Sequence, residues 1–281
     1  MQRVHTVAAM QQLCRELRER HQSIHLVPTM GALHAGHLSL VRRARQDGGC
    51  VIVTIFVNPL QFGPSEDFSR YPRTLEADCA LLEQEDVTAV FVPEVAEMYP
   101  PGACTTLTVA GLSDRLDGAS RPGHFTGVAT VVAKLFHAVP ADRAYFGQKD
   151  AAQLAVIRRM VRDLNFGIAI VGCPIVRDPD GLALSSRNAY LSPQERTQAL
   201  ALQRCLLAMQ AALASGIRDT ETLLATGHAV LAAEPAVRLD YLAVVDADEL
   251  LPVPIAVPGT LVAIAAWVGT TRLIDNLLVQ A

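Results

Sequence analysis

Apolar residues along this chain follow two spacings, one typical of strands and one typical of helices. Short, nearly continuous apolar runs predict strands buried on both faces, and the clearest is VIVTIFV at 51–57. Between these runs, apolar residues recur every three or four positions, which predicts amphipathic helices. Thr6 and Thr74 are placed to cap two of those helices. The predicted strands are 23–28, 51–57, 88–93, 143–147 and 167–176, and the predicted helices are 6–21, 36–47, 74–86, 125–138 and 151–164.

The pattern changes after about residue 177, where the polar, turn-rich stretch RDPDGLALSSRNAYL (177–191) begins. A capping box follows, with Ser192 at the N-cap, Pro193 in the first turn and Glu195 three residues after the cap. It predicts a long helix that ends near residue 215. The remaining predicted elements are a helix at 220–234 and strands near 239–246 and 260–268.

These elements predict two domains. Alternating strands and helices favour an α/β, Rossmann-like parallel sheet with helices on both faces, which we expect over residues 1–180. Residues 181–281 then form a smaller α+β C-terminal domain, which we expect to act as a lid. In parallel sheets of this kind, ligands bind beyond the carboxyl ends of the strands.

Composition excludes several classes of protein. Of the 281 residues, 51% are apolar, which is ample for a core, and the net charge of −4 gives no sign of a nucleic-acid partner. The strongest apolar run, LVAIAAWVG (261–269), is far shorter than the roughly 18 residues of a membrane span. The N-terminus carries charges throughout, unlike a signal peptide. Six scattered cysteines without a C-x-x-C pair favour reduced thiols, so we expect a cytoplasmic protein without a membrane partner.

Candidate chemistry begins in VPTMGALHAGHLSLVRRA (27–44), where His34 and His37 flank Gly36 at the start of a predicted helix. A helix N-terminus offers unpaired N–H groups and partial positive charge, which suit phosphate. Gly31 and Gly36 would let the backbone approach a ligand closely. A plain loop with surface histidines is the alternative. A zinc site is disfavoured because the motif holds no third ligand.

Three further stretches place polar side chains where a ligand could reach them. Gln61 follows the run at 51–57, and its amide could hold a hydroxy acid without adding charge. Lys149 lies between a strand and a helix, where it could neutralise phosphate. LSSR (184–187) combines hydroxyls with a guanidinium, a set that suits phosphate. Taken singly, each is better explained as part of an ordinary surface loop.

The motif PTMGALHAGH resembles the nucleotide-binding motif of the pantoate–β-alanine ligase family, part of the His-x-Gly-His nucleotidylyl transferases. The resemblance continues in order over nearly the whole chain. The further matching stretches are IFVNPLQFGPSEDFSRYPRT (55–74), RPGHFTGVATVVAKLF (121–136), YFGQKD (145–150), GLALSSRN (181–188) and RLIDN (272–276). It implies an ATP-dependent condensation of pantoate with β-alanine to pantothenate, through a pantoyl adenylate, with release of AMP and pyrophosphate.

The resemblance also implies roles for individual residues. His37, His34 and Lys149 would be catalytic. The ATP site would comprise Pro28, Thr29, Met30, Gly31, His34, Gly36, His37, Gly147, Gln148, Lys149, Asp150, Val176, Leu184, Ser185, Ser186 and Arg187. Gln61, Gln153 and Asn58 would bind pantoate and β-alanine.

Further expectations concern metal, frame and assembly. Mg²⁺ is expected on the triphosphate, with Asp78 as a candidate for handling it, and Asp117 and Arg121 would form a hydrogen-bonded frame. The resemblance implies a homodimer. Two positions depart from the family, which often has Glu at 148 and usually has Gln at 152. The alternatives are a simple nucleotidylyl transferase, whose product keeps the nucleotide, and a nucleotide-binding regulatory module without catalysis.

Overall fold

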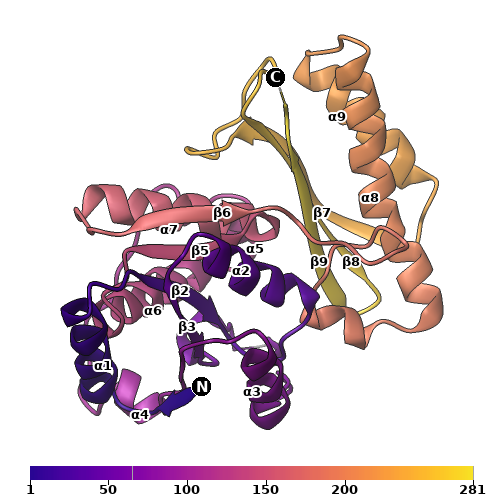
Figure 1. Cartoon of the computed structure of the whole chain (residues 1–281). Coiled ribbons are helices and arrows are strands. Elements are labelled where there is room, and N and C mark those ends of the chain that lie inside the picture. The colour runs from indigo at the N-terminus through magenta and orange to yellow at the C-terminus, as the bar shows by residue number, and fades with distance from the viewer. Residues whose placement is uncertain (65, 281) are drawn as a thin grey trace.

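The computed structural model describes residues 1–64 and 66–280. Within these ranges, six parallel strands form one sheet in the order β1-β4-β3-β2-β5-β6 (Figure 1). The strands are β1 (Gln2–Val4), β2 (Ile24–Thr29), β3 (Cys50–Ile55), β4 (Ala89–Phe91), β5 (Arg143–Gly147) and β6 (Ala169–Cys173). The parallel α/β fold is confirmed, and so are the five predicted strands. The three-residue strand β1 was not predicted because it is too short to show a pattern.

Both faces of this sheet are covered by helices. The helices of this region are α1 (Val7–Glu19), α2 (Ala35–Gln46), α3 (Leu75–Gln84), α4 (Val95–Met98), α5 (Asp117–Ser120), α6 (His124–Ala138) and α7 (Ala151–Asp163). Successive strand residues point to opposite faces. Leu26 therefore joins the core cluster under α1, α6 and α7, while the next residue, Val27, joins the cluster under α2 and α3. Burial on both faces explains why the strands read as unbroken apolar runs.

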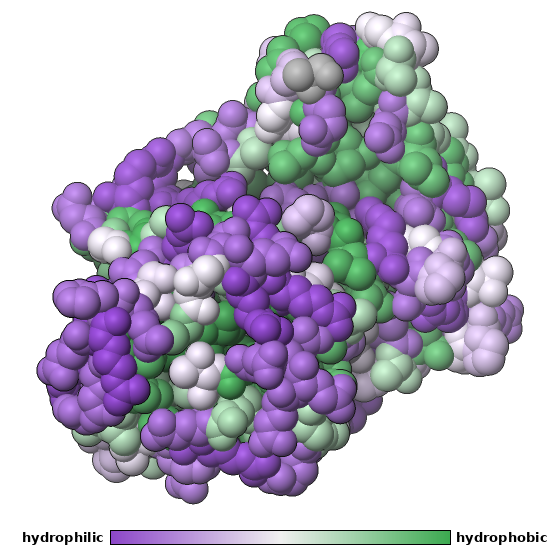
Figure 2. Space-filling view, viewed as in Figure 1, coloured by the Kyte–Doolittle hydropathy of each residue, from purple (hydrophilic) through white to green (hydrophobic). Residues whose placement is uncertain are grey.

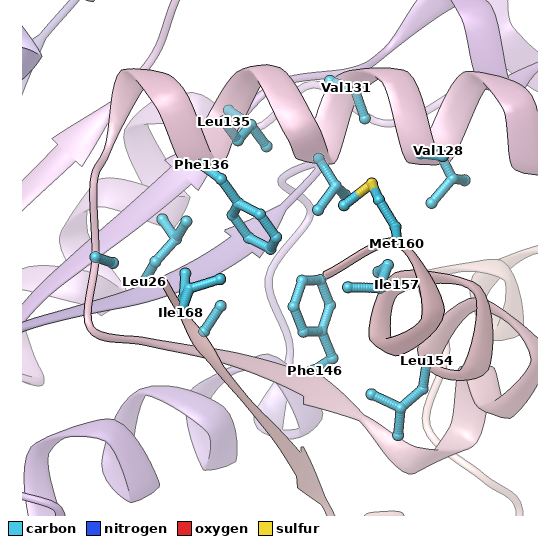
Figure 3. Close-up of a cluster of buried hydrophobic side chains, with 14 of the residues drawn as sticks. Leu26, Val128, Val131, Leu135, Phe136, Phe146, Leu154, Ile157, Met160 and Ile168 are labelled. Atoms are coloured by element: carbon cyan, nitrogen blue, oxygen red, sulfur yellow. The ribbon is translucent and has the colours of Figure 1, made fainter. Parts of the chain in front are cut away.

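The larger cluster interlocks α6 and α7 with β5. Figure 3 shows Phe136 of α6 and Met160 of α7 beside Phe146 of β5. All three side chains are at least 95% buried. Full burial of one such side chain stabilises a fold by about 1.5–3 kcal/mol. This packing holds the carboxyl end of β5, where Gly147 lies, in a fixed position.

The helix caps were predicted with mixed success. The Thr6 side chain accepts a hydrogen bond from the Ala9 N–H at 3.3 Å, as predicted. The capping box also forms, since Ser192 Oγ accepts from the Glu195 N–H at 3.3 Å and Glu195 Oε2 accepts from the Ser192 N–H at 2.8 Å. The predicted Thr74 cap is wrong. Thr74 stands at the N-cap of α3 but makes no side-chain cap bond there.

A second, antiparallel sheet lies C-terminal to the first. It has the order β7-β8-β9 within the described residues, with α8 and α9 on the side away from the parallel sheet (Figure 1). These elements are α8 (Pro193–Ala214), α9 (Thr220–Ala232), β7 (Val237–Asp246), β8 (Thr260–Val268) and β9 (Thr271–Leu278). Central strand β8 is buried on both faces: Leu261 joins the first core and Val262 joins the core under α8 and α9.

Strand β9 was not predicted from the sequence. Its segment TRLIDNLL interrupts the apolar positions with Asp275 and Asn276, both of which are buried and make polar contacts to other segments. The predicted domain boundary after residue 180 lies between β6 and α8, and it stays a prediction. We refer below to the parallel-sheet region and the C-terminal region.

The two regions differ at the surface. Figure 2 shows mostly hydrophilic residues on the visible face of the parallel-sheet region, whereas hydrophobic residues gather on the C-terminal region. Of the helices in residues 1–64 and 66–280, none has the length and hydropathy needed to cross a membrane.

Candidate active site

Two adjoining cavities lie where the carboxyl ends of the parallel strands meet β9. The larger has a volume of about 600 Å³ and the smaller about 220 Å³. Several residues line both and so form a common wall. They are Arg121, His124, Lys149, Asp150, Gln153, Ser185 and Arg187. The position agrees with the rule that ligands bind beyond the carboxyl ends of the strands in such sheets.

Most of the predicted site residues line the smaller cavity together. They are Pro28, Thr29, Met30, His34, Gly36, His37, Asn58, Gln61, Gly147, Lys149, Asp150, Gln153, Val176, Leu184, Ser185, Ser186 and Arg187. Gly31, Asp78 and Gln148 line neither cavity. The structure therefore brings together segments from residue 28 to residue 187, while the individual ligand roles stay predictions.

The two histidines of the first motif form a capping box at the start of α2. His34 is the N-cap, and its Nδ1 accepts a hydrogen bond from the Gly36 N–H at 3.1 Å. His37 is the third helical residue, and its Nδ1 accepts from the His34 N–H at 3.3 Å. Capping boxes are usually built from Ser or Thr with Glu or Gln. Here two imidazoles make the equivalent contacts, with ring centroids 4.1 Å apart.

These contacts determine the charge and tautomer of both rings. Burial, with a smaller effect from His34, lowers the pKa of His37 to about 3. Burial and the nearby Lys149 also lower the pKa of His34. Both rings are therefore neutral near pH 7. Because each Nδ1 accepts a hydrogen bond, each ring carries its proton on Nε2, which is then a donor.

Gly36 makes room for an imidazole. A Cβ at this position would lie 2.9 Å from Nδ1 and Cε1 of His34, closer than side chains normally approach. The expectation from sequence was that this glycine lets the backbone approach a ligand. The structure adds a second reason for it: the space beside Gly36 is occupied by the His34 ring.

Asp78 holds the loop that carries these histidines. Its side chain is 2% exposed, and its two oxygens accept hydrogen bonds from the Ala32 N–H at 2.9 Å and the Leu33 N–H at 2.8 Å. Thr74 donates a third bond at 3.2 Å, which explains why that hydroxyl does not cap α3. The predicted metal role of Asp78 stays a prediction, but both oxygens are already engaged.

Gln61 is positioned by a buried asparagine. Asn58 is 1% exposed, and its amide nitrogen donates to Gln61 Oε1 at 3.1 Å. The Asn58 oxygen accepts from the Leu60 N–H at 3.2 Å and from the Tyr99 hydroxyl at 2.8 Å. Gln61 Nε2 lies 2.9 Å from Met30 Sδ. With both ends of its amide occupied inside the protein, Asn58 orients Gln61.

A cluster of Glu66, Arg121 and His124 holds the other side of Gln61. Arg121 pairs with Glu66 through two bonds of 2.7 and 2.6 Å, and its Nη1 donates to His124 Nε2 at 2.9 Å. His124 Nδ1 donates to the Gln61 carbonyl at 2.7 Å. Burial, with a smaller effect from Arg121, lowers the pKa of His124 to about 4, so the ring is neutral.

His124 and Glu66 were not singled out from the sequence, although both lie in stretches that match the family. A histidine three residues after Arg121, at the start of a predicted helix, was the available signal. Helix α6 reaches Gln61 because Gly127 allows close packing: a Cβ there would lie 2.1 Å from the Leu60 carbonyl oxygen.

The loop that carries Lys149 is fastened to the C-terminal region. Asn276 Nδ2 donates to the carbonyl oxygens of Gln148 and Lys149, both at 2.9 Å. The Lys149 ammonium lies 3.7 Å from Asp150. Of the two departures from the family, Ala152 is 2% exposed within the core, and Gln148 lies outside the lining of both cavities.

Further contacts join the regions around the larger cavity. Arg272 of β9 donates to Asp117 Oδ1 at 2.7 Å and to Asp240 at 2.7 Å, and the Tyr241 hydroxyl donates to Asp117 Oδ2 at 3.1 Å. The geometry is compatible with the frame role that the resemblance implies for Asp117. At the LSSR segment, the Tyr71 hydroxyl lies 3.4 Å from Ser186 Oγ.

The site can stabilise negative charge on a bound phosphate. Two neutral imidazole donors and Lys149 line the same small cavity as two glutamines, Gln61 and Gln153. Donors aimed at developing charge are effective where water is excluded. Among the described residues there is no group of three or more His, Cys, Asp or Glu side chains that could hold a metal ion.

Comparisons with known proteins agree with this geometry. The family model for pantoate-beta-alanine ligase matches residues 2–278. A pantothenate synthetase from Koribacter versatilis is 60% identical over 281 residues, covering 100% of this chain and 97% of the relative.

Solved structures lead to the same family. A pantothenate synthetase from Thermus thermophilus superposes with a TM-score of 0.93 at 50% identity and covers 100% of both chains. A pantoate-beta-alanine ligase from Francisella tularensis, solved in complex with beta-gamma ATP and beta-alanine, gives 0.80 at 32% identity, covering 99% of this chain and 97% of that one.

Proposed function

The chain belongs to the pantoate–β-alanine ligase family, and we propose that it forms its amide bond in two steps, through a pantoyl adenylate. As a ligase of this family, it condenses pantoate with β-alanine in an ATP-dependent reaction that makes a precursor of coenzyme A. One observation carries the proposal of two steps. The phosphate donors His34, His37 and Lys149 share one cavity with a pair of neutral amides suited to a hydroxy acid.

In the first step, a carboxylate oxygen of pantoate attacks the α-phosphorus of ATP. A new P–O bond forms, the bond to the bridging oxygen breaks, and pyrophosphate leaves. The Nε2–H groups of His34 and His37 donate to the phosphate oxygens as charge develops on them, and the Lys149 ammonium offsets the charge of the triphosphate. Gln61 and Gln153 orient pantoate for the attack.

In the second step, the amine of β-alanine attacks the activated carbonyl carbon. The C–N bond forms, the C–O bond to AMP breaks, and the amine loses a proton. The wall formed by the C-terminal region keeps water from the mixed anhydride, which supports a lid function for residues 181–281.

The substrate form and cellular setting complete the proposal. ATP enters as its magnesium complex, because the described residues offer no metal cage and phosphates carry the ion with them. The family resemblance supports a homodimer that works in the cytoplasm. Light scattering of the purified protein measures the oligomeric state, and a monomer would contradict that part.

Isotope scrambling tests the order of steps. ATP labelled with ¹⁸O at the αβ-bridging position is incubated with enzyme and magnesium, with and without pantoate. If adenylate formation is reversible and bound pyrophosphate rotates, label moves to non-bridging positions when pantoate is present and β-alanine is absent. Scrambling that requires β-alanine would instead indicate a concerted reaction. Release of AMP, measured with all three substrates, distinguishes the ligase from a simple nucleotidylyl transferase, whose product keeps the nucleotide.

A further inference from the structure

The second substrate, β-alanine, brings a carboxylate that needs a cationic partner. Within the described residues, the cations on the wall of the smaller cavity are Arg121, Lys149 and Arg187. Lys149 lies in the segment that directly follows β5, the strand on which α2 with its two histidines packs. Arg187 belongs to the LSSR segment, which packs beside Gly36 through Leu184. Both cations therefore lie toward the phosphate end of the site.

Arg121 lies at the opposite, acyl end. Its Nη2 is 3.3 Å from the carbonyl oxygen of Gln61, the residue proposed to bind pantoate. Like Lys149 and Arg187, it also lines the larger cavity, from which a third substrate can approach. The bond that forms in the second step joins the pantoyl carbonyl to the amine of β-alanine. The carboxylate of β-alanine lies only two methylene groups from that amine, so its partner must lie close to Gln61.

The guanidinium of Arg121 is held by an exchangeable carboxylate. One N–H contacts His124 and another contacts the Gln61 carbonyl, and both of these partners belong to the folded wall. Glu66 makes the two remaining bonds in bidentate geometry. Burial alone would raise the pKa of Glu66, but the Arg121 guanidinium holds it below its usual value. A fork of this kind accepts any carboxylate of matching geometry.

We propose that Arg121 binds the carboxylate of β-alanine, and that this carboxylate displaces Glu66 from the guanidinium fork. The inference rests on the proposed function, and it assigns a specificity residue for the second substrate. Glu66 keeps the half-buried guanidinium paired until β-alanine arrives. An amine without a carboxylate cannot make the exchange and is therefore a poor acceptor.

The test compares two acceptors of similar length, β-alanine and n-propylamine, which lacks the carboxylate. In Arg121→Gln, kcat/KM for β-alanine should fall about 10- to 100-fold, the range for losing hydrogen bonds between charged groups. At saturating pantoate and ATP, the value for n-propylamine should fall much less than the value for β-alanine, so the preference collapses. If the preference survives in Arg121→Gln, or both values fall by the same factor, the proposal is overturned.

A second variant should strengthen the binding of β-alanine instead of weakening it. Glu66→Gln weakens the competing pair, so the KM for β-alanine should fall, and a higher KM would overturn the exchange. This variant decides the question alone if Arg121→Gln does not fold. The matched control is Arg42→Gln, since Arg42 forms a similar fork with Glu85 at 2.5–3.1 Å outside both cavities. It should leave the preference unchanged. Wild-type enzyme that releases no AMP from all three substrates would refute the proposed function instead.

Discussion

The two groups of half-buried histidines in this site use their ring nitrogens in opposite ways. In His34 and His37, the backbone occupies each Nδ1, and the proton sits on Nε2. In His124, Nδ1 carries the proton and donates to the Gln61 carbonyl, while Nε2 accepts from Arg121. All three rings are held neutral by burial, which lowers their pKa.

This difference separates histidines that can donate to a ligand from a histidine that only positions another residue. The first pair keeps one N–H per ring for a ligand, so its proposed role lies in the chemistry. His124 has both nitrogens occupied by the protein, so it is a positioning residue. The amino-acid type and the protonation state are the same in both places, and the partner of Nδ1 alone makes the difference.

Removing a donor should have the largest effect. His37→Ala should slow adenylate formation by roughly 10²–10³, the usual effect of losing one such donor. His37→Gln places an amide N–H near the former Nε2 and should recover part of the rate, whereas His37→Asn should not. Single-turnover kinetics with saturating ATP measures this step. Equal rates in the Gln and Asn variants would contradict the assigned tautomer.

The next effect concerns the residue that the second histidine group supports. Gln61→Ala should raise the KM for pantoate about 10- to 100-fold, because a buried polar group left unpaired costs roughly 1–3 kcal/mol. The KM for ATP should change little. Gln11→Ala is the control, since Gln11 bonds to the His137 carbonyl on the surface. A loss of ATP affinity in Gln61→Ala would contradict the assignment of this side chain to the pantoate pocket.

A support should matter less than the group it holds. His124→Leu should raise the KM for pantoate by about tenfold or less, since one of the contacts that hold Gln61 is lost. The rate of adenylate formation at saturating pantoate should stay close to wild type. A fall in that rate as large as in His37→Ala would mean that His124 acts on the reacting atoms.

A further effect should appear in the pH dependence of stability, which is separate from the kinetic effects above. Unfolded histidine has a pKa near 6.5, whereas His37 and His124 stay neutral in the folded state down to about 3 and 4. Between these values the unfolded chain binds more protons, so the free energy of unfolding rises with pH. The contribution of these rings to the free energy of unfolding should be fully present above pH 6.5. Below that pH it should decline by at most about 1.4 kcal/mol per pH unit for each ring.

Urea denaturation at a series of pH values measures this slope. In His124→Leu the slope of the free energy of unfolding against pH should be smaller by the contribution of one histidine ring. An unchanged slope in that variant would show that His124 titrates alike in both states. The rate of adenylate formation should show no loss with an apparent pKa near 6.5, because protonated rings are not formed there.

Much of the architecture could be predicted because strands such as β3 are apolar on both faces, and that pattern is local. Strand β9 could not be predicted, since its Asp275 and Asn276 interrupt the apolar pattern. Their partners, Arg177 and the loop at 148–149, lie about 100 residues or more away along the chain. Those contacts exist only after both regions have folded.

In the site, too, local patterns could be predicted and contacts between distant residues could not. The grouping of His34, Gly36 and His37 at the start of a helix was predictable because they lie within four residues of one another. The cluster around Gln61 was not, because Glu66 and Arg121 are separated by 55 positions and meet only when α6 packs on the segment at 58–61. Which nitrogen of each ring carries the proton depends on those contacts, so the residue type alone does not reveal it.

The bond from Asn276 to the carbonyls of Gln148 and Lys149 sets an order of events during synthesis. All six strands of the parallel sheet have been synthesised once β6, which ends at Cys173, has left the ribosome. The loop that carries Lys149 still lacks its fastening at that moment, because Asn276 lies about 100 residues beyond β6 along the chain. A nascent chain therefore holds every strand of the parallel sheet well before its site can be finished, and a chain truncated before β9 would lack the bond that fastens the Lys149 loop.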